Sequence, residues 1–151
     1  MILNAEVLNG YLIIKQVHAI ISILFLVIAV WLLIRSVRGI LKNITYTRLD
    51  KFLSYGFIIN LYIQLIFGLI LFSNPGLIFG NNYSGAEGGL KMASNRFWPI
   101  EHIVLMLFAL FIANLGLILS SQSTISKEKH KKVIIYYVSA LIMIAISLSA
   151  Y

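Results

Sequence analysis

The sequence contains no cysteine. This absence excludes thiolate metal sites, iron–sulfur clusters, covalently attached haem and disulfides, because all of them need cysteine sulfur. Any metal or cofactor in this chain must therefore be held by other side chains.

Charged residues are also scarce: they make up 11% of the 151 residues, whereas hydrophobic residues make up 60%. This composition excludes an ordinary soluble domain. The apolar residues form four runs without the alternation of barrel strands, and each run approaches or exceeds the ~20 residues needed to cross a bilayer. The runs cover residues 11–34, 52–73, 97–119 and 133–151.

These runs predict one all-α membrane domain over residues 1–151, an up-down bundle of four transmembrane helices in contact with the lipid bilayer. Residues 74–96, rich in glycine and asparagine, are expected to form the largest loop on the outer side. The first run has no preceding basic residue and no cleavage site, so we expect a membrane span rather than a secretory signal.

The net charge of +7 follows the membrane and does not indicate a nucleic-acid partner. Most cations lie between the first two runs or between the last two, so the positive-inside rule places both termini on the outer side. The first group is Arg35, Arg38, Lys42, Arg48 and Lys51; the second is Lys127, Lys129, Lys131 and Lys132; only Lys15, Lys91 and Arg96 belong to the outer side.

Two histidines carry the main functional hypothesis. His18 lies roughly 10 Å into the first predicted helix and His102 roughly 7–8 Å into the third, at 1.5 Å per residue. Both helices start on the outer side, so the two imidazoles are expected at one level, where they could hold a haem iron from both sides. Gly68 of the second helix and Ala145 and Ser147 of the fourth reach the same level.

Each predicted helix has one face expected to point into the bundle, because amides directed at lipid would be unsatisfied and small residues allow close approach. These faces are His18, Ser22, Phe25 and Ala29; Asn60, Gln64 and Gly68; His102, Met106, Ala109, Ala113 and Gly116; and Tyr136, Ala140, Met143 and Ser147.

Haem propionates need cations or amide donors, and Lys15 and Arg96 are the candidates. Both also fit as interfacial anchors, as does Lys91. Glu101 is expected to be a solvated acid near a helix N-terminus, or an acceptor of a quinol proton. His130, in a basic loop, is expected to be exposed and not a ligand, and Tyr62 is expected at a helix contact.

With these residues considered, the chain resembles a family of small bacterial four-helix membrane proteins described as cytochrome-b-like. The resemblance rests on residues 46–51, residues 64–72, Arg96-Phe97 with Glu101-His102, and residues 129–132. It implies the bacterial cytoplasmic membrane, one haem b held by His18 and His102, and electron transfer. Family members often have a histidine where this chain has Tyr62, which argues against a second haem.

The leading hypothesis is therefore a b-type cytochrome with bis-histidine ligation, with a quinone or a larger respiratory complex as partner. One alternative is a non-haem metal or copper-handling protein that uses His18, His102, Met106 and Met143. Another is an accessory structural subunit of a larger membrane complex. A transporter is disfavoured because there are no broken central helices and no acidic residue near mid-membrane.

Overall fold

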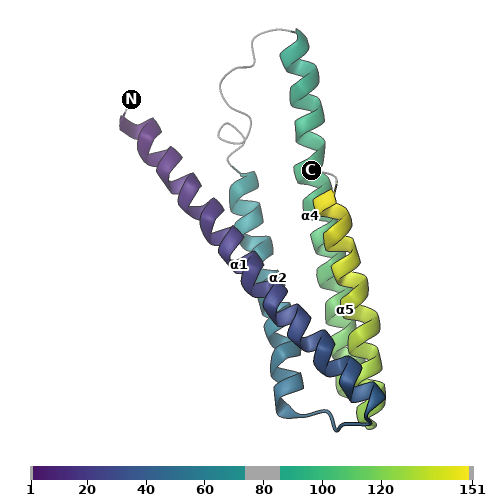
Figure 1. Cartoon of the computed structure of the whole chain (residues 1–151). Coiled ribbons are helices and arrows are strands. Elements are labelled where there is room, and N and C mark those ends of the chain that lie inside the picture. The colour runs from purple at the N-terminus through teal and green to yellow at the C-terminus, as the bar shows by residue number, and fades with distance from the viewer. Residues whose placement is uncertain (1, 74–85, 150–151) are drawn as a thin grey trace.

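The computed structural model describes the backbone of residues 2–73 and 86–149 and the side chains of residues 9–73 and 100–149. Within these ranges the chain forms four helices and no strand (Figure 1). Each helix contains a segment long and apolar enough to cross a membrane. The prediction of an all-α four-helix membrane protein is confirmed. The helices are α1 (Ile2–Leu41), α2 (Arg48–Phe72), α4 (Ala86–Gln122) and α5 (Ser126–Ser149).

The helices extend beyond the apolar runs into polar sequence. α5 begins at Ser126, so the basic segment before residue 133 is helical, and lysine is a good helix former. α4 begins at Ala86, so the last part of the expected outer loop is helical as well, and residues 74–85 lie outside the described residues. The candidate spans are Asn9–Leu41, Arg48–Phe72, Ile100–Gln122 and Ser126–Ser149.

Local signals set the turn between α1 and α2. Asn43 adopts a left-handed conformation, with φ of 50°, and the amide of Ile44 donates to the carbonyl of Gly39 at 3.1 Å. This bond closes the C-terminus of α1 in the manner of a Schellman motif, and asparagine tolerates that backbone conformation. Thr47 then caps α2, and the Asp50 side chain reaches back to it in a capping box.

Lys132 closes the turn between α4 and α5. Its ammonium donates to the carbonyl of Leu119 at 3.0 Å and to the hydroxyl of Ser123 at 2.6 Å. A cation at this position satisfies an unpaired carbonyl and opposes the negative end of the α4 dipole. The two helices are therefore held antiparallel by a short polar link.

The helices are arranged in the cyclic order α1–α2–α4–α5. In the described residues α4 packs most extensively on α5, and α1 on α2; α1 also contacts α5, and α2 contacts α4. This leaves α1 diagonal to α4 and α2 diagonal to α5. Figure 1 shows α1 tilted across the bundle, with its N-terminal part lying away from α4 and α5.

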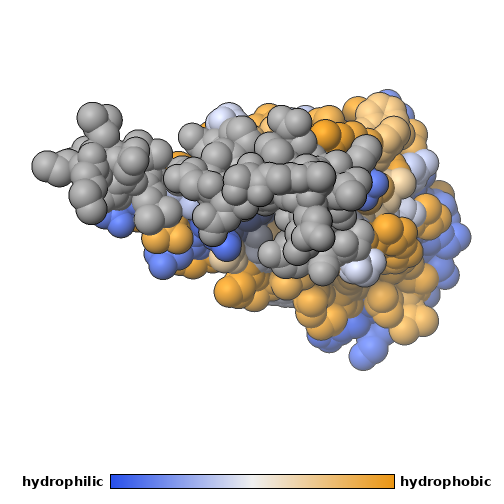
Figure 2. All heavy atoms as spheres, turned by 90° about the horizontal axis from the view of Figure 1, so that it is seen from above, coloured by the Kyte–Doolittle hydropathy of each residue, from blue (hydrophilic) through white to orange (hydrophobic). Residues whose placement is uncertain are grey.

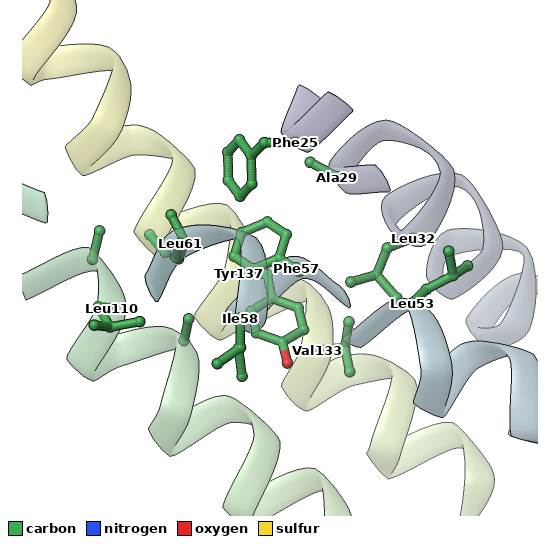
Figure 3. Packing of buried hydrophobic residues seen from close by; sticks show 13 residues of the cluster. Phe25, Ala29, Leu32, Leu53, Phe57, Ile58, Leu61, Leu110, Val133 and Tyr137 are labelled. Atoms are coloured by element: carbon green, nitrogen blue, oxygen red, sulfur yellow. The ribbon is translucent and has the colours of Figure 1, made fainter. Parts of the chain in front are cut away.

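The core lies in the half of the bundle near the two short links. Phe57 is at its centre, fully buried, with ring centroids 4.7 Å from Phe25 and 4.6 Å from Tyr137 (Figure 3). Ala29 and Ala140 are buried and allow the helices to approach closely. Other buried apolar residues around this centre are Leu32, Leu53, Ile58, Leu61, Ala109, Leu110, Ala113 and Val133.

The outer surface of the bundle is apolar, as contact with a lipid bilayer requires. Figure 2 shows hydrophobic residues on several sides of the described surface. These side chains face away from the core that contains Phe57, and lipid tails are the solvent that suits them. Examples more than half exposed are Leu26, Val27, Ile59, Phe108, Phe111, Ile142 and Ile146.

Candidate functional site

His18 and His102 belong to diagonal helices and both lie partly buried inside the bundle. Both histidines that the sequence predicted at one depth are therefore partly enclosed by the bundle. An ionisable pair inside a membrane bundle is costly and usually functional.

His18 lies against Gly68 of α2. A Cβ built on Gly68 would be 4.0 Å from Cε1 of His18, so the missing side chain leaves room beside the ring. Nδ1 of His18 is buried and has no hydrogen-bond partner among the described residues. A buried ring nitrogen without a partner loses its hydration without compensation, which makes this nitrogen a candidate to bind a ligand.

Two amides of α2 lie beside His18. Nε2 of Gln64 donates to the His18 carbonyl at 3.2 Å and to the Ser22 hydroxyl at 2.9 Å. Nδ2 of Asn60 donates to the carbonyl of Ile21 at 3.3 Å. The expected inward direction of this polar face is confirmed. Oε1 of Gln64 and Oδ1 of Asn60 remain buried without partners among the described residues, so these two oxygens can each accept a hydrogen bond from a further donor.

His102 is held from α5. Its Nδ1 is 2.6 Å from the hydroxyl of Ser147, which is itself almost fully buried. Such a bond fixes the orientation of the imidazole, and histidines that bind metals are normally oriented in this way through the nitrogen that does not bind. Ser147 thus reaches the histidine level as expected, whereas Ala145 is exposed and faces away.

The remaining predicted residues near this end contribute less. Lys15 is exposed on α1, one turn before His18, and Glu101 is exposed on α4. The side chains of Arg96 and Lys91 lie outside the described residues. Tyr62 contacts a neighbouring helix, as expected: its hydroxyl accepts a hydrogen bond from Nδ2 of Asn114 at 3.3 Å.

A second polar cluster lies at the opposite end, near the two short links. Arg35 of α1 binds Asp50 of α2 at two points, with Nε 2.6 Å from Oδ1 and a terminal guanidinium nitrogen 3.1 Å from Oδ2. The backbone amide and hydroxyl of Thr47 also donate to Oδ2, at 2.7 and 2.6 Å. Asp50 is fully buried, and this set of donors stabilises its charge.

Two tyrosines complete this cluster. The phenol of Tyr46 is 2.9 Å from the hydroxyl of Ser54, and the phenol of Tyr137 donates to the carbonyl of Ser54 at 3.4 Å. Burial raises the pKa of Tyr46, which keeps its phenol protonated. The cluster joins α1, α2 and α5 through hydrogen bonds, in addition to the apolar packing of the core.

The expectation that His130 is exposed was wrong. His130 is 1% exposed, and its ring lies 4.9 Å from that of Tyr46, between centroids. It fits because Gly39 of α1 has no side chain, and a Cβ built there would overlap the imidazole. A sequence dense in lysines suggests solvent, but the close approach of α1 and α5 encloses this one residue.

The sequence contained one signal for this cluster that our interpretation missed. Thr47 and Asp50 have the Thr-x-x-Asp spacing of a capping box before an apolar run, which predicts a helix start there. Nothing in the sequence paired Arg35 with Asp50, since the pair depends on the turn between α1 and α2.

The described residues contain no group of three or more histidine, aspartate or glutamate side chains that could hold a metal ion. Comparisons with protein-family models, with curated proteins and with solved structures find no match to this chain. The functional hypothesis therefore depends on the site itself.

Proposed function

We propose that this protein is a b-type membrane cytochrome in which His18 and His102 would hold one haem. The observation that supports this best is that both imidazoles lie partly buried on diagonal helices of the bundle, His18 against Gly68 and His102 hydrogen-bonded to Ser147. A haem held from both faces needs two imidazoles on opposite sides of a slot, and diagonal helices of a bundle supply that arrangement.

The surrounding residues fit such a group. Gly68 leaves space beside the His18 ring. Nδ1 of His18 has no hydrogen-bond partner among the described residues, and a bound cofactor would supply one. Ser147 is hydrogen-bonded to Nδ1 of His102. This bond orients the imidazole before any ligand binds, as is usual for histidines that bind metals. Haem would supply one-electron redox chemistry at this place.

The chain's own residues would set the properties of that chemistry. Lys15, exposed one turn from His18, is a cation available to a propionate, and Arg96 is the second candidate from the sequence. The surrounding apolar helices would exclude water, and the neutral imidazoles would add no negative charge. The low dielectric would then favour reduced haem, which has no net charge at the iron–porphyrin centre, over oxidised haem, which has one positive charge there. A quinone in the membrane, or a larger respiratory complex, is the proposed electron-transfer partner.

We further propose a bacterial cytoplasmic membrane with both termini on the outer side. The two cation-rich links lie at the same end of the bundle, since α1 leads into α2 there and α4 leads into α5 (Figure 1). The positive-inside rule assigns that end to the cytoplasm. The histidine site would then lie in the outer half of the membrane.

An absorption spectrum tests the proposed cofactor. The protein purified from haem-replete cells is expected to show a Soret band that shifts on reduction with dithionite, with haem near one equivalent per chain. His18→Ala and His102→Ala should each abolish the low-spin spectrum. His130→Gln is the matched control, because it removes the third histidine, at the opposite end, and should leave the spectrum unchanged.

Three other outcomes of these experiments would contradict the haem proposal or support one of its alternatives. A colourless protein that takes up no added haem would contradict the proposal. Copper or another metal found by elemental analysis, lost in both His18→Ala and His102→Ala, would support the non-haem metal alternative instead. Co-purification with a large complex, unaffected by either variant, would support an accessory structural subunit.

The proposed orientation has a separate test, because the chain has no cysteine and single cysteines can be added to a clean background. Asn9→Cys and Thr124→Cys replace exposed residues at opposite ends of the bundle. A membrane-impermeant maleimide added to intact cells should label Asn9→Cys only. Labelling of Thr124→Cys alone would reverse the orientation.

A further inference from the structure

A cavity of about 220 Å³ lies at the end of the bundle opposite the histidines. It is bounded by the link before α2, the first turn of α2, the end of α4 and the start of α5. Its lining combines cations, hydroxyls and one apolar residue: Arg48, Lys51, Lys129, Tyr46, Thr47, Ser120, Ser121 and Leu117.

The three cations of this cavity have no acidic partner among the described side chains. The ion pairs among the described side chains are Arg35–Asp50 and Lys131–Glu128, and neither includes a cation that lines the cavity. The nearest buried carboxylate is already committed to Arg35 and Thr47. The positive charge of the cavity is therefore available to an anion.

Two of the cations are also positioned by aromatic rings. The ammonium of Lys129 lies 5.7 Å from the centroid of the Tyr46 ring, and that of Lys51 lies 5.9 Å from the ring of Tyr55. Ring contacts of this kind restrict flexible lysine side chains. The hydroxyls that line the cavity already donate to other groups. The donors available in this small space are therefore the three cations, which suit phosphate oxygens.

The position of the cavity identifies the source of the anion. α2 begins and α4 ends at this level, so the cavity lies where the apolar spans meet the aqueous phase. Exposed apolar side chains follow directly, with Phe52 of α2 72% exposed and Ile118 of α4 50% exposed. A phospholipid has the same order of groups: an anionic phosphate at the interface and an acyl chain beside it.

We propose that this cavity binds the phosphate headgroup of an anionic phospholipid through Arg48, Lys51 and Lys129. The cavity is large enough for the headgroup but not for the whole lipid, so the acyl chains would lie along the exposed apolar surface of α2 and α4. Such a lipid would contact the start of α2, the end of α4 and the start of α5 at once, and so would hold these three helix ends together.

The chain offers a matched control for the effect of charge alone. Arg38, Lys42 and Lys127 are exposed cations in or next to the same two links, and none of them lines the cavity. The variant Arg48→Gln/Lys51→Gln/Lys129→Gln and the control Arg38→Gln/Lys42→Gln/Lys127→Gln carry the same net charge. Binding that depends on the positive end of the protein in general would weaken equally in both.

The experiment measures binding of phosphatidylglycerol to the full chain in neutral micelles at ~0.15 M salt, where exposed charges more than ~8 Å apart are screened. The cavity variant should lose affinity by about a hundredfold, since each of its three cations near an anionic headgroup contributes about a factor of five. The control should lose less than about threefold. Phosphatidylcholine should bind neither protein measurably.

Two results would overturn the proposal. Equal losses in the cavity variant and the control would show general electrostatic attraction. Displacement of phosphatidylglycerol by inorganic phosphate at equal concentration would assign the cavity to free phosphate rather than to a lipid. If the triple variant does not fold, Lys129→Gln compared with Lys127→Gln answers the same question, and an equal loss there would also overturn it.

Discussion

Arg35 at the end of α1 and Asp50 at the start of α2 form a two-point ion pair, with the closer N–O distance at 2.6 Å. The Asp50 side chain is 1% exposed and the Arg35 side chain 28% exposed, so the pair joins a buried acid to a partly exposed base. It joins α1 to α2 at the end of the bundle opposite His18.

Replacement of this acid should destabilise the protein. Asp50→Asn removes the charge that compensates Arg35 and weakens two hydrogen bonds from Thr47. We expect the free energy of unfolding in mixed micelles to fall by about 2–4 kcal/mol. Glu128→Gln is the control: it removes an exposed pair with Lys131 and should change the same quantity by less than about 0.5 kcal/mol. Equal effects would contradict the structural role of Asp50.

Gly39 should be essential for the burial of His130. Gly39→Ala places a methyl group on the imidazole, so we expect a loss of about 1–3 kcal/mol of unfolding free energy. In the double variant Gly39→Ala/His130→Ala the methyl group occupies space that the ring has left. The two changes should therefore cost less together than the sum of their separate effects, measured in a double-mutant cycle. Additive costs would show that the two residues do not touch.

The tight packing of α4 on α5 depends on Gly116. A Cβ on this residue would overlap the side chain of Tyr136, so Gly116→Ala should lower the free energy of unfolding by about 1–3 kcal/mol. Gly10→Ala in α1 meets no atom within 4 Å and should be neutral or raise helix stability by up to about 1 kcal/mol. A stable Gly116→Ala protein would contradict the close contact of these helices.

Phe57 should stabilise the fold through its packing contacts and not through the hydrophobic effect. Lipid tails are as apolar as the core, so removal of a buried ring costs the lost packing but little transfer free energy. Phe57→Ala should therefore lower the free energy of unfolding by about 2 kcal/mol, less than in a soluble protein. Phe52→Ala, at a 72% exposed position on the same helix, should have almost no effect in the same denaturation measurement.

The amino-acid sequence by itself determined the class of fold. Long apolar runs admit only helices in lipid, and the spacing of polar and small residues then predicts which face of each helix points inward. This prediction is confirmed for Phe25, Asn60, Gln64, Ala113 and Ala140, which are all buried. The depth argument also predicts one level for His18 and His102, because the rise per residue of a helix is constant.

Only the tertiary structure decided which helices are diagonal, which carboxylate Arg35 binds, and that His130 is buried. Each of these depends on how closely two helices approach and on how they rotate about their axes. A pattern within one helix fixes the face but not the neighbour that it meets. The absent side chain of Gly39 matters only once α5 is known to pass beside it, which is why no local signal predicted the place of His130.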